Sequence, residues 1–263
     1  MVTDNHNIEF GYELIAVIPF AYWLHTQGKL TGTISNFDSS LFYYFSPNHT
    51  ERDERRHSRK WKDMRLYYDN GDVHRSILDL SRWVPPPYKN YYANDEYNFK
   101  KPLLIVTNKY NLEWKNPPAN YLDVPMLEWI FRTYRDDYEI VYSRFRKDMG
   151  YDDTVDTMDL GEWDLVKSMR IKTIQDLKKD GESYNFLQLK LYPHCEKFIT
   201  VQGGTAILAS YFGGDNIIFA RKGMEIKRKT YQNWYSLFGG SRIHHVQDYG
   251  ALKACSKKVL SLS

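Results

Sequence analysis

The sequence predicts an α/β protein whose C-terminal part forms a doubly wound parallel sheet. Residues 102–107 are a continuous apolar run of the kind that is buried on both faces in such a sheet. Beyond it, short β-favouring runs alternate with segments of helical spacing. A glycine pair at 203–204 lies between a β-favouring stretch and a helix-compatible one. These features indicate strands joined by crossover helices.

The N-terminal part is shorter and less regular. Residues 8–24 predict a short strand or loop, a turn at Gly11 and an apolar helix that ends near Gly28. Residues 34–45 are aromatic and β-prone, and residues 51–60 form a mixed-charge run that is either a solvated segment or a basic flap over an anionic ligand. The stretch 83–92 holds three consecutive prolines followed by Tyr-Lys-Asn-Tyr-Tyr, and we expect a non-helical linker there. We therefore divide the chain into domains 1–92 and 93–263.

The C-terminal elements are expected in alternating order. Strands are predicted at residues 102–107, 139–142, 171–174, 198–201, 216–220 and 242–246. Helices are predicted at residues 124–134, 162–169, 183–195, 205–212 and 230–238, and from 249 onward.

The overall composition limits the classes of partner. A net charge of +3 does not indicate nucleic acid. Two cysteines form neither a disulfide framework nor a metal cluster, which favours a reducing cytoplasm. The longest apolar run, 14–24, is too short to span a bilayer, so we expect no stable membrane insertion. An aromatic content of 16% suits ring-shaped ligands such as sugars, although aromatic residues also fill cores.

Polar residues and glycines follow three of the predicted strands. Because the carboxyl ends of parallel strands meet at one edge of a sheet, these residues should converge. A glycine pair lets a ligand approach the backbone, and a helix N-terminus favours phosphate. The predicted diphosphate-binding residues are Asn108, Lys109, Arg144, Arg146, Gly203, Gly204 and Thr205. The alternative is that the arginines pair with acidic residues at 148, 152 and 153.

Carboxylates in the N-terminal part are candidates for a general base. Glu13 falls in the first turn of the apolar helix, where the helix dipole alone also favours an acid. Asp38 is a competing candidate and His49 a third. Metal-ligand patterns such as Cys-x-x-Cys are absent, and His244 and His245 are adjacent on a predicted strand, so their side chains point to opposite faces. We expect neither a metal nor another cofactor.

In these features the chain resembles glycosyltransferases of the two-domain GT-B type. Most of residues 93–263, with the segment Lys-Phe-Ile-Thr-Val-Gln-Gly-Gly-Thr-Ala-Ile-Leu-Ala at 197–209, is similar to the donor domain of heptosyltransferases and fucosyltransferase-like enzymes. Residues 11–19 resemble the heptosyltransferase segment in which an acid follows glycine and precedes an apolar run and a proline. The spacing from Glu13 to Pro19 agrees, and Tyr12 is one extra residue. Small cytosolic transferases of bacterial polysaccharide clusters and of large DNA viruses are also similar.

The resemblance implies a fold of two Rossmann-like halves, with the parallel sheet in the C-terminal donor domain and a reduced N-terminal acceptor domain. It implies metal-independent, inverting transfer from a nucleotide-diphosphate sugar, such as UDP-xylose or another UDP-sugar, or GDP-fucose, to a glycan or glycoconjugate. Glu13 would be the base, with Gly11, Tyr12 and His49 on the acceptor side. A non-catalytic glycan-binding module and a nucleic-acid-binding protein built around residues 52–65 remain alternatives.

Overall fold

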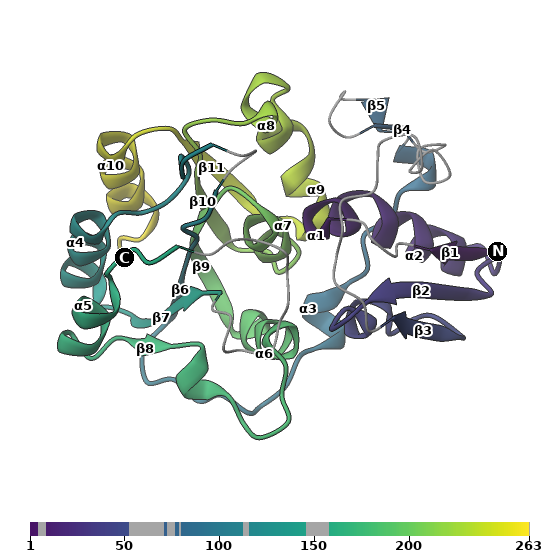
Figure 1. Cartoon of the computed structure of the whole chain (residues 1–263), viewed down its shortest axis with the longest axis horizontal. Helices are drawn as coiled ribbons and strands as arrows, with labels where there is room; N and C mark the ends of the chain where they lie inside the picture. The colour runs from purple at the N-terminus through teal and green to yellow at the C-terminus, as the bar shows by residue number, and fades with distance from the viewer. Residues whose placement is uncertain are drawn as a thin grey trace.

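The computed structural model describes residues 1–4, 9–52, 80–112, 116–145 and 158–262, and the backbone of 71–72 and 77–78. The chain forms two α/β parts that lie side by side (Figure 1). Among the described residues, no helix is long and apolar enough to cross a lipid bilayer.

The C-terminal part is built on a six-stranded sheet in the order β11-β10-β9-β6-β7-β8, and all of its recorded pairings are parallel. Its strands are β6 (Leu103–Asn108), β7 (Glu139–Arg144), β8 (Lys172–Thr173), β9 (Cys195–Val201), β10 (Asp215–Phe219) and β11 (Arg242–Val246). The chain begins in the middle with β6, builds outward through β7 and β8, and then crosses back to β9. The predicted doubly wound parallel sheet is therefore confirmed, and its direction of winding switches between β6 and β9.

Helices cover both faces of this sheet (Figure 1). They are α4 (Val124–Tyr134), α5 (Trp163–Ser168), α6 (Tyr184–Leu191), α7 (Gly204–Ser210), α8 (Met224–Lys227), α9 (Ser236–Gly239) and α10 (Tyr249–Val259). Alternate residues of β6 enter opposite cores: Leu103 and Ile105 pack toward α6 and α7, and Leu104 and Val106 pack toward α4 and α10. Burial on both faces explains the continuous apolar run in the sequence.

The N-terminal part has a three-stranded parallel sheet of order β1-β2-β3, formed by β1 (Val2–Asp4), β2 (Gly32–Asn36) and β3 (His49–Arg52). A helix runs from α1 (Phe10–Tyr12) through a π-helical turn (Glu13–Val17) into α2 (Ile18–Thr26). Glu9 caps it, and Gly11 lies inside it, so the expected turn at Gly11 is wrong. A two-stranded pair, β4 (Gly71–Asp72) and β5 (Ile77–Leu78), completes the described backbone. Of the mixed-charge run 51–60, only residues 51–52 are described, at the end of β3.

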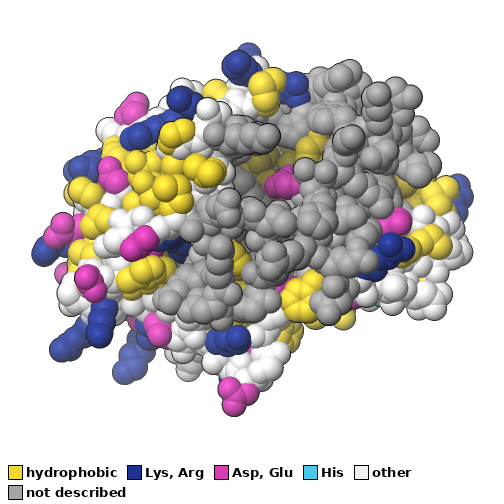
Figure 2. Space-filling view, in the orientation of Figure 1, with side chains coloured by type: hydrophobic (Ala, Val, Ile, Leu, Met, Phe, Trp, Pro, Cys, Tyr) yellow, Lys and Arg dark blue, Asp and Glu magenta, His cyan; other side chains and the backbone are white. Residues whose placement is uncertain are grey.

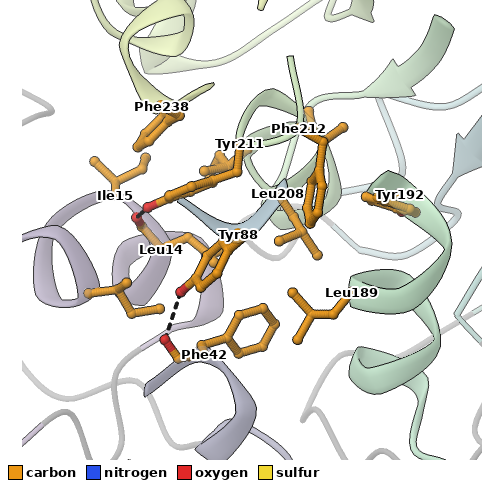
Figure 3. Packing of buried hydrophobic residues seen from close by; sticks show 14 of the residues in the cluster. Leu14, Ile15, Phe42, Tyr88, Leu189, Tyr192, Leu208, Tyr211, Phe212 and Phe238 are labelled. Carbon is orange, nitrogen blue, oxygen red and sulfur yellow. Dashed lines mark hydrogen bonds between the residues drawn. The ribbon is translucent and has the colours of Figure 1, made fainter. Parts of the chain in front are cut away.

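Pro19 accounts for the π-helical turn. Ile18 N–H donates to Glu13 O, so Leu14 O loses its usual donor, and Pro19 has no N–H to offer Leu14 O or Ile15 O. Side chains from distant segments take over these carbonyls. Tyr211 Oη donates to Leu14 O (Figure 3), and Trp83 Nε1 donates to Ile15 O at 2.7 Å. The irregular turn is thus held by tertiary hydrogen bonds.

Residues 83–92, expected to be a non-helical linker, are packed into the protein. Trp83 and Tyr88 are buried, and a short helix α3 (Tyr88–Tyr91) follows the prolines. Tyr88 Oη donates to Phe42 O at 2.8 Å, and its ring lies 5.0 Å from that of Tyr211 (Figure 3). One hydrophobic core therefore runs from the N-terminal helix through this segment to α7.

Short 3-10 turns join several elements: Ser40–Tyr43, Leu80–Arg82, Gln175–Leu177 and Tyr192–His194. The predicted boundaries of α4 and β11 and the start of α10 are confirmed. Two further expectations need correction. Cys195 belongs to β9 and not to the preceding helix, and the helix expected at 230–238 divides into a π-helical turn (Tyr231–Tyr235) and α9.

Candidate functional site

A cavity of about 200 Å³ opens at the carboxyl ends of β6 and β9, where the winding of the sheet switches. Open parallel sheets bind their ligands at this place, because the chain turns to opposite sides there and leaves a crevice. The C-terminal part supplies most of the wall, and the start of α1 closes one side. The lining residues are Glu9, Phe10, Asn108, Lys109, Tyr110, Asn111, Arg144, Phe145, Tyr184, Asn185, Gln188, Gln202, Gly203, Gly204 and Thr205.

The residues predicted at the strand ends converge on this cavity. Those that line it are Asn108, Lys109, Arg144, Gly203, Gly204 and Thr205. Arg146 lies outside the described residues. The convergence follows from strand order, since β6, β7 and β9 are neighbours and end at the same edge.

Lys109 brings a cation to the cavity. Its Nζ donates to Gln202 Oε1 at 2.9 Å and lies 3.8 Å from the position that a Cβ on Gly203 would occupy. The ammonium is therefore next to the glycine loop and the start of α7.

Arg144 is a buried cation in the cavity wall, with 4% of its surface exposed. Its partner is Glu162, which is fully buried and also accepts from Tyr142 Oη at 3.3 Å. Arg144 also donates to Met158 O. Pairing with an acid was one of the expected alternatives, but the partner is Glu162 and residues 148, 152 and 153 lie outside the described part. Arg144 Nε has no hydrogen-bond partner among the described residues.

Asn108 has a structural task at the cavity. Its Oδ1 accepts from Lys109 N and Leu122 N, both at 2.9 Å, and its Nδ2 donates to Leu122 O at 2.9 Å. The side chain thereby pins the loop before α4 to the end of β6. It shapes the wall and orients the backbone from which Lys109 projects.

The two glycines of the loop differ in their backbone. Gly203, which precedes α7, has φ +135°, a conformation that side chains rarely adopt. Gly204 is the first residue of α7, and a Cβ there would lie 2.8 Å from Phe10 Cδ1. Gly203 thus permits the turn, and Gly204 permits the close approach of α1 to α7. The first N–H groups of a helix have no partner within it, and here they belong to residues of the cavity wall.

The carboxylate that lines the cavity is Glu9, which the sequence analysis did not select. It caps α1, accepting from Gly11 N at 3.1 Å and Tyr12 N at 3.3 Å. Glu13, one turn later, is fully buried and outside the lining, where it accepts from Tyr43 Oη at 3.1 Å and Ser39 Oγ at 3.4 Å.

Asp38 also lies outside the cavity lining and joins the two parts of the chain. With φ +57°, it turns so that its carboxylate accepts from Asn185 N at 3.3 Å and its carbonyl from Asn185 Nδ2 at 2.6 Å. Its own N–H donates to Glu51 Oε1 at 3.0 Å. Asp38 thereby attaches the loop after β2 to the start of α6, and Asn185 lines the cavity.

The residues expected on the acceptor side do not line the cavity. Gly11 and Tyr12 lie within α1, and a Cβ on Gly11 would be 3.3 Å from Ile207 Cδ1 of α7. His49 is held between Thr33 Oγ1 at 2.7 Å and Ser35 Oγ at 3.0 Å, and burial lowers its pKa although Glu51 opposes the shift. His49 therefore supports the small sheet.

Metal-binding geometry is absent from the described part of the chain, where no group of three or more His, Cys, Asp or Glu residues could hold an ion. His244 and His245 point to different partners, as expected for neighbours on a strand. The imidazole of His244 lies 2.9 Å from Asp215 Oδ1, and that of His245 lies 3.2 Å from Ala220 O.

No protein-family model matches the sequence, and no curated protein is similar enough to match. Among solved structures, the ADP-heptose lipopolysaccharide heptosyltransferase II of E. coli aligns with 99% of this chain and 99% of its own, with a TM-score of 0.58 and 10% sequence identity. A glycosyltransferase of family 9 from Veillonella parvula aligns with 88% of this chain and 60% of its own, with a TM-score of 0.37 and 14% identity. Over its whole length, this chain has the α/β fold with parallel sheets that the GT-B-type E. coli heptosyltransferase has.

Proposed function

We propose that this protein is a glycosyltransferase that moves a sugar from a nucleoside-diphosphate donor to a hydroxyl of a glycan or glycoconjugate acceptor. The observation that carries the proposal is the cavity at the switch point between β6 and β9, where Lys109 lies beside the glycine loop and the start of α7. The fold, shared over the full chain with a heptosyltransferase, supports it.

The donor's diphosphate fits the chemistry of this end of the cavity. Lys109 supplies an ammonium, Gly203 to Thr205 supply backbone at a helix start, and Arg144 supplies a buried guanidinium. Such groups stabilise the negative charge that grows on a departing nucleoside diphosphate. We therefore propose metal-independent catalysis. We also propose a cytoplasmic location, because two free cysteines are typical of a reducing compartment. A cavity volume of about 200 Å³ matches the diphosphate end of the donor rather than a whole nucleotide sugar, since pockets for drug-sized ligands have volumes of roughly 300–1,000 Å³.

We further propose that Glu9 is the general base of an inverting reaction. Its carboxylate takes the proton of the acceptor hydroxyl while the hydroxyl oxygen attacks the anomeric carbon. The bond from that carbon to the phosphate oxygen breaks, and the nucleoside diphosphate leaves with the electron pair. Glu9 is preferred to Glu13 and Asp38 because it alone of the three lines the cavity.

The alternative of a glycan-binding module rested on the abundance of aromatic residues. Most of the largest fully buried side chains are tyrosines: Tyr43, Tyr88, Tyr138, Tyr142, Tyr192, Tyr211, Tyr231 and Tyr235. These rings form the core, so their number does not call for a sugar-binding surface. For nucleic acid, residues 53–65 lie outside the described part, and on the face in Figure 2 the described basic side chains are interspersed with acidic ones.

Isothermal calorimetry with UDP, GDP and ADP in the presence of EDTA tests the proposal. We expect one nucleoside diphosphate to bind with micromolar affinity and its monophosphate to bind more weakly, because the diphosphate meets more of the cationic wall. Binding that requires manganese would overturn metal independence. Absence of binding by all three, with or without manganese, would overturn the function.

A further inference from the structure

Behind Lys109, a buried amide and a carboxylate form a hydrogen-bonded chain that leads out of the cavity. We infer that Gln202 and Glu225 are positioning residues, which hold the Lys109 ammonium where the donor's diphosphate binds. The inference rests on the proposed function for the identity of the anion. The hydrogen bonds that join Lys109, Gln202 and Glu225 do not depend on the identity of the anion.

The contacts form a continuous series. Lys109 Nζ donates to Gln202 Oε1 at 2.9 Å, and Gln202 Nε2 donates to Glu225 Oε1 at 2.8 Å. Gln202 is 6% exposed and lines the cavity, whereas Glu225 lies outside the lining. Among the described residues, the amide of Gln202 joins Glu225 to Lys109.

The partners fix the orientation of the Gln202 amide. An ammonium only donates and a carboxylate only accepts, so a single orientation satisfies both. Asn120 favours the same orientation of the Gln202 amide, since its Nδ2 donates to Gln202 Oε1 at 3.3 Å. The Asn120 amide is itself fixed, because its Oδ1 accepts from Arg221 N at 2.7 Å and Lys222 N at 3.0 Å. A reversed Gln202 amide would place its NH₂ group against the ammonium and its oxygen against the carboxylate.

The backbone before Glu225 is shaped for this contact. Gly223 has φ +147°, and a Cβ there would lie 2.5 Å from Glu225 Oε2. Glycine therefore leaves the space in which the carboxylate folds back toward Gln202. The glycine at position 223 is thus explained by the position of the Glu225 carboxylate.

The consequence for binding is a cation that is in place before the ligand arrives. The carboxylate compensates the positive charge of the half-buried ammonium while the cavity is empty. An ammonium has three donors, so a bond to a phosphate oxygen does not require Lys109 to give up its bond to Gln202. Holding the side chain in advance reduces the ordering cost of binding.

A double-mutant cycle on the nucleoside diphosphate that binds the parent most tightly tests this role. Gln202→Met, which keeps length but makes no hydrogen bond, should weaken binding about tenfold, as expected for one bond to a charged group. In a Lys109→Met background the same change should have no further effect. A Gln202→Met effect that persists at full size without Lys109 would show that Gln202 acts on its own and would overturn the inference.

Chemical labelling decides the same question without any ligand. An N-hydroxysuccinimide ester acylates only the neutral form of an amine, and hydrogen-bond acceptors such as Gln202 Oε1 stabilise the charged ammonium instead. Gln202→Met and Glu225→Gln should therefore each accelerate Lys109 labelling severalfold relative to Lys89. Lys89 pairs with Glu196 and serves as the internal reference. Unchanged labelling in both variants would overturn the relay. If the parent binds no nucleoside diphosphate, the proposed function fails, while labelling still decides the relay.

Discussion

Glu9 and Glu13 stand one helical turn apart, yet their surroundings differ completely. Glu9 lines the cavity and caps α1, and Glu13 is fully buried against Tyr43 and Ser39. A general base must reach a substrate hydroxyl, which is possible for Glu9 in the present geometry. The two residues therefore form a matched pair for testing the proposed catalysis.

Glu9→Gln should lower the rate of sugar transfer by about 10²–10⁴-fold, because the amide keeps the length of the side chain and one of its two hydrogen bonds to the cap but accepts no proton. Nucleotide affinity should stay near that of the parent. Glu13→Gln should leave the rate within a few-fold and act on melting temperature instead. Steady-state release of nucleoside diphosphate, with calorimetry and thermal melting alongside, measures all three. A slow Glu13→Gln enzyme beside a normal Glu9→Gln enzyme would return the role to Glu13.

At this scale the sequence predicted the residues that follow strands and missed those that depend on partners. Lys109 and Gly203 are visible because the strands before them are strongly apolar. Gln202 directly precedes the glycine pair, so its position was a signal, but its contacts with Lys109 and Glu225 join residues far apart in the chain. Glu9 precedes a glycine that was expected to form a turn. Recognising Gly11 as helical would have revealed Glu9 as the cap.

Among the elements, the N-terminal helix contains a π-helical turn that accepts hydrogen bonds from side chains of other segments. Trp83 Nε1 donates to Ile15 O, a buried carbonyl that Pro19 leaves without a helical donor. An unsatisfied buried carbonyl costs about 1–3 kcal/mol. The helix therefore relies on the segment that the sequence suggested was a linker.

Trp83→Phe should lower the free energy of unfolding by about 1–3 kcal/mol beyond the loss of ring volume, because Ile15 O then has no donor. Trp234→Phe is the matched control: Trp234 is also buried, but its Nε1 has no partner among the described residues. Urea unfolding of both variants measures the difference. Equal losses would mean that the Trp83 hydrogen bond does not sustain the turn.

Elements with local signals were predicted well. Asp123 and Asp248 cap α4 and α10 by accepting from the N–H groups of Met126 and Ala251, and both helix starts were predicted correctly. The burial of Tyr88 could not be predicted, because it depends on rings from Phe42 and Tyr211 far away in the sequence. Three consecutive prolines indicate a break in helix, and they do not show whether the chain there is packed or exposed.

In the molecule as a whole, Asp215 joins the strands at one side of the large sheet. It accepts from Lys197 Nζ of β9 at 2.8 Å and from Arg242 Nε of β11 at 2.8 Å, and His244 Nε2 lies 2.9 Å away. Burial alone would raise the pKa of Asp215, but the hydrogen bonds from these groups outweigh it and hold the pKa well below its usual range.

This lowered pKa makes the stability of the fold depend on acid. An unfolded aspartate takes up its proton near pH 3.9, before the folded one does, so the stabilisation is complete above about pH 5 and is lost as the pH falls further. Urea midpoints measured from pH 7 to pH 3 should therefore drop more for the parent than for Asp215→Asn. The variant should be less stable at pH 7, and the gap should narrow toward pH 3 without closing, because the rest of the stabilisation is lost only as the pH falls through the folded pKa. Parallel pH curves for the two proteins would contradict this role.

The core that runs from the N-terminal helix through Tyr88 to Tyr211 and Phe212 has a consequence for how such a chain diverges. A change of side-chain volume on the apolar face of one half is felt by the other, so substitutions there are coupled. Connecting loops in general tolerate substitutions and insertions more readily. Lineages of this protein would therefore change the ligand of the cavity more readily by remodelling loops, while the joint between the halves is inherited as one unit.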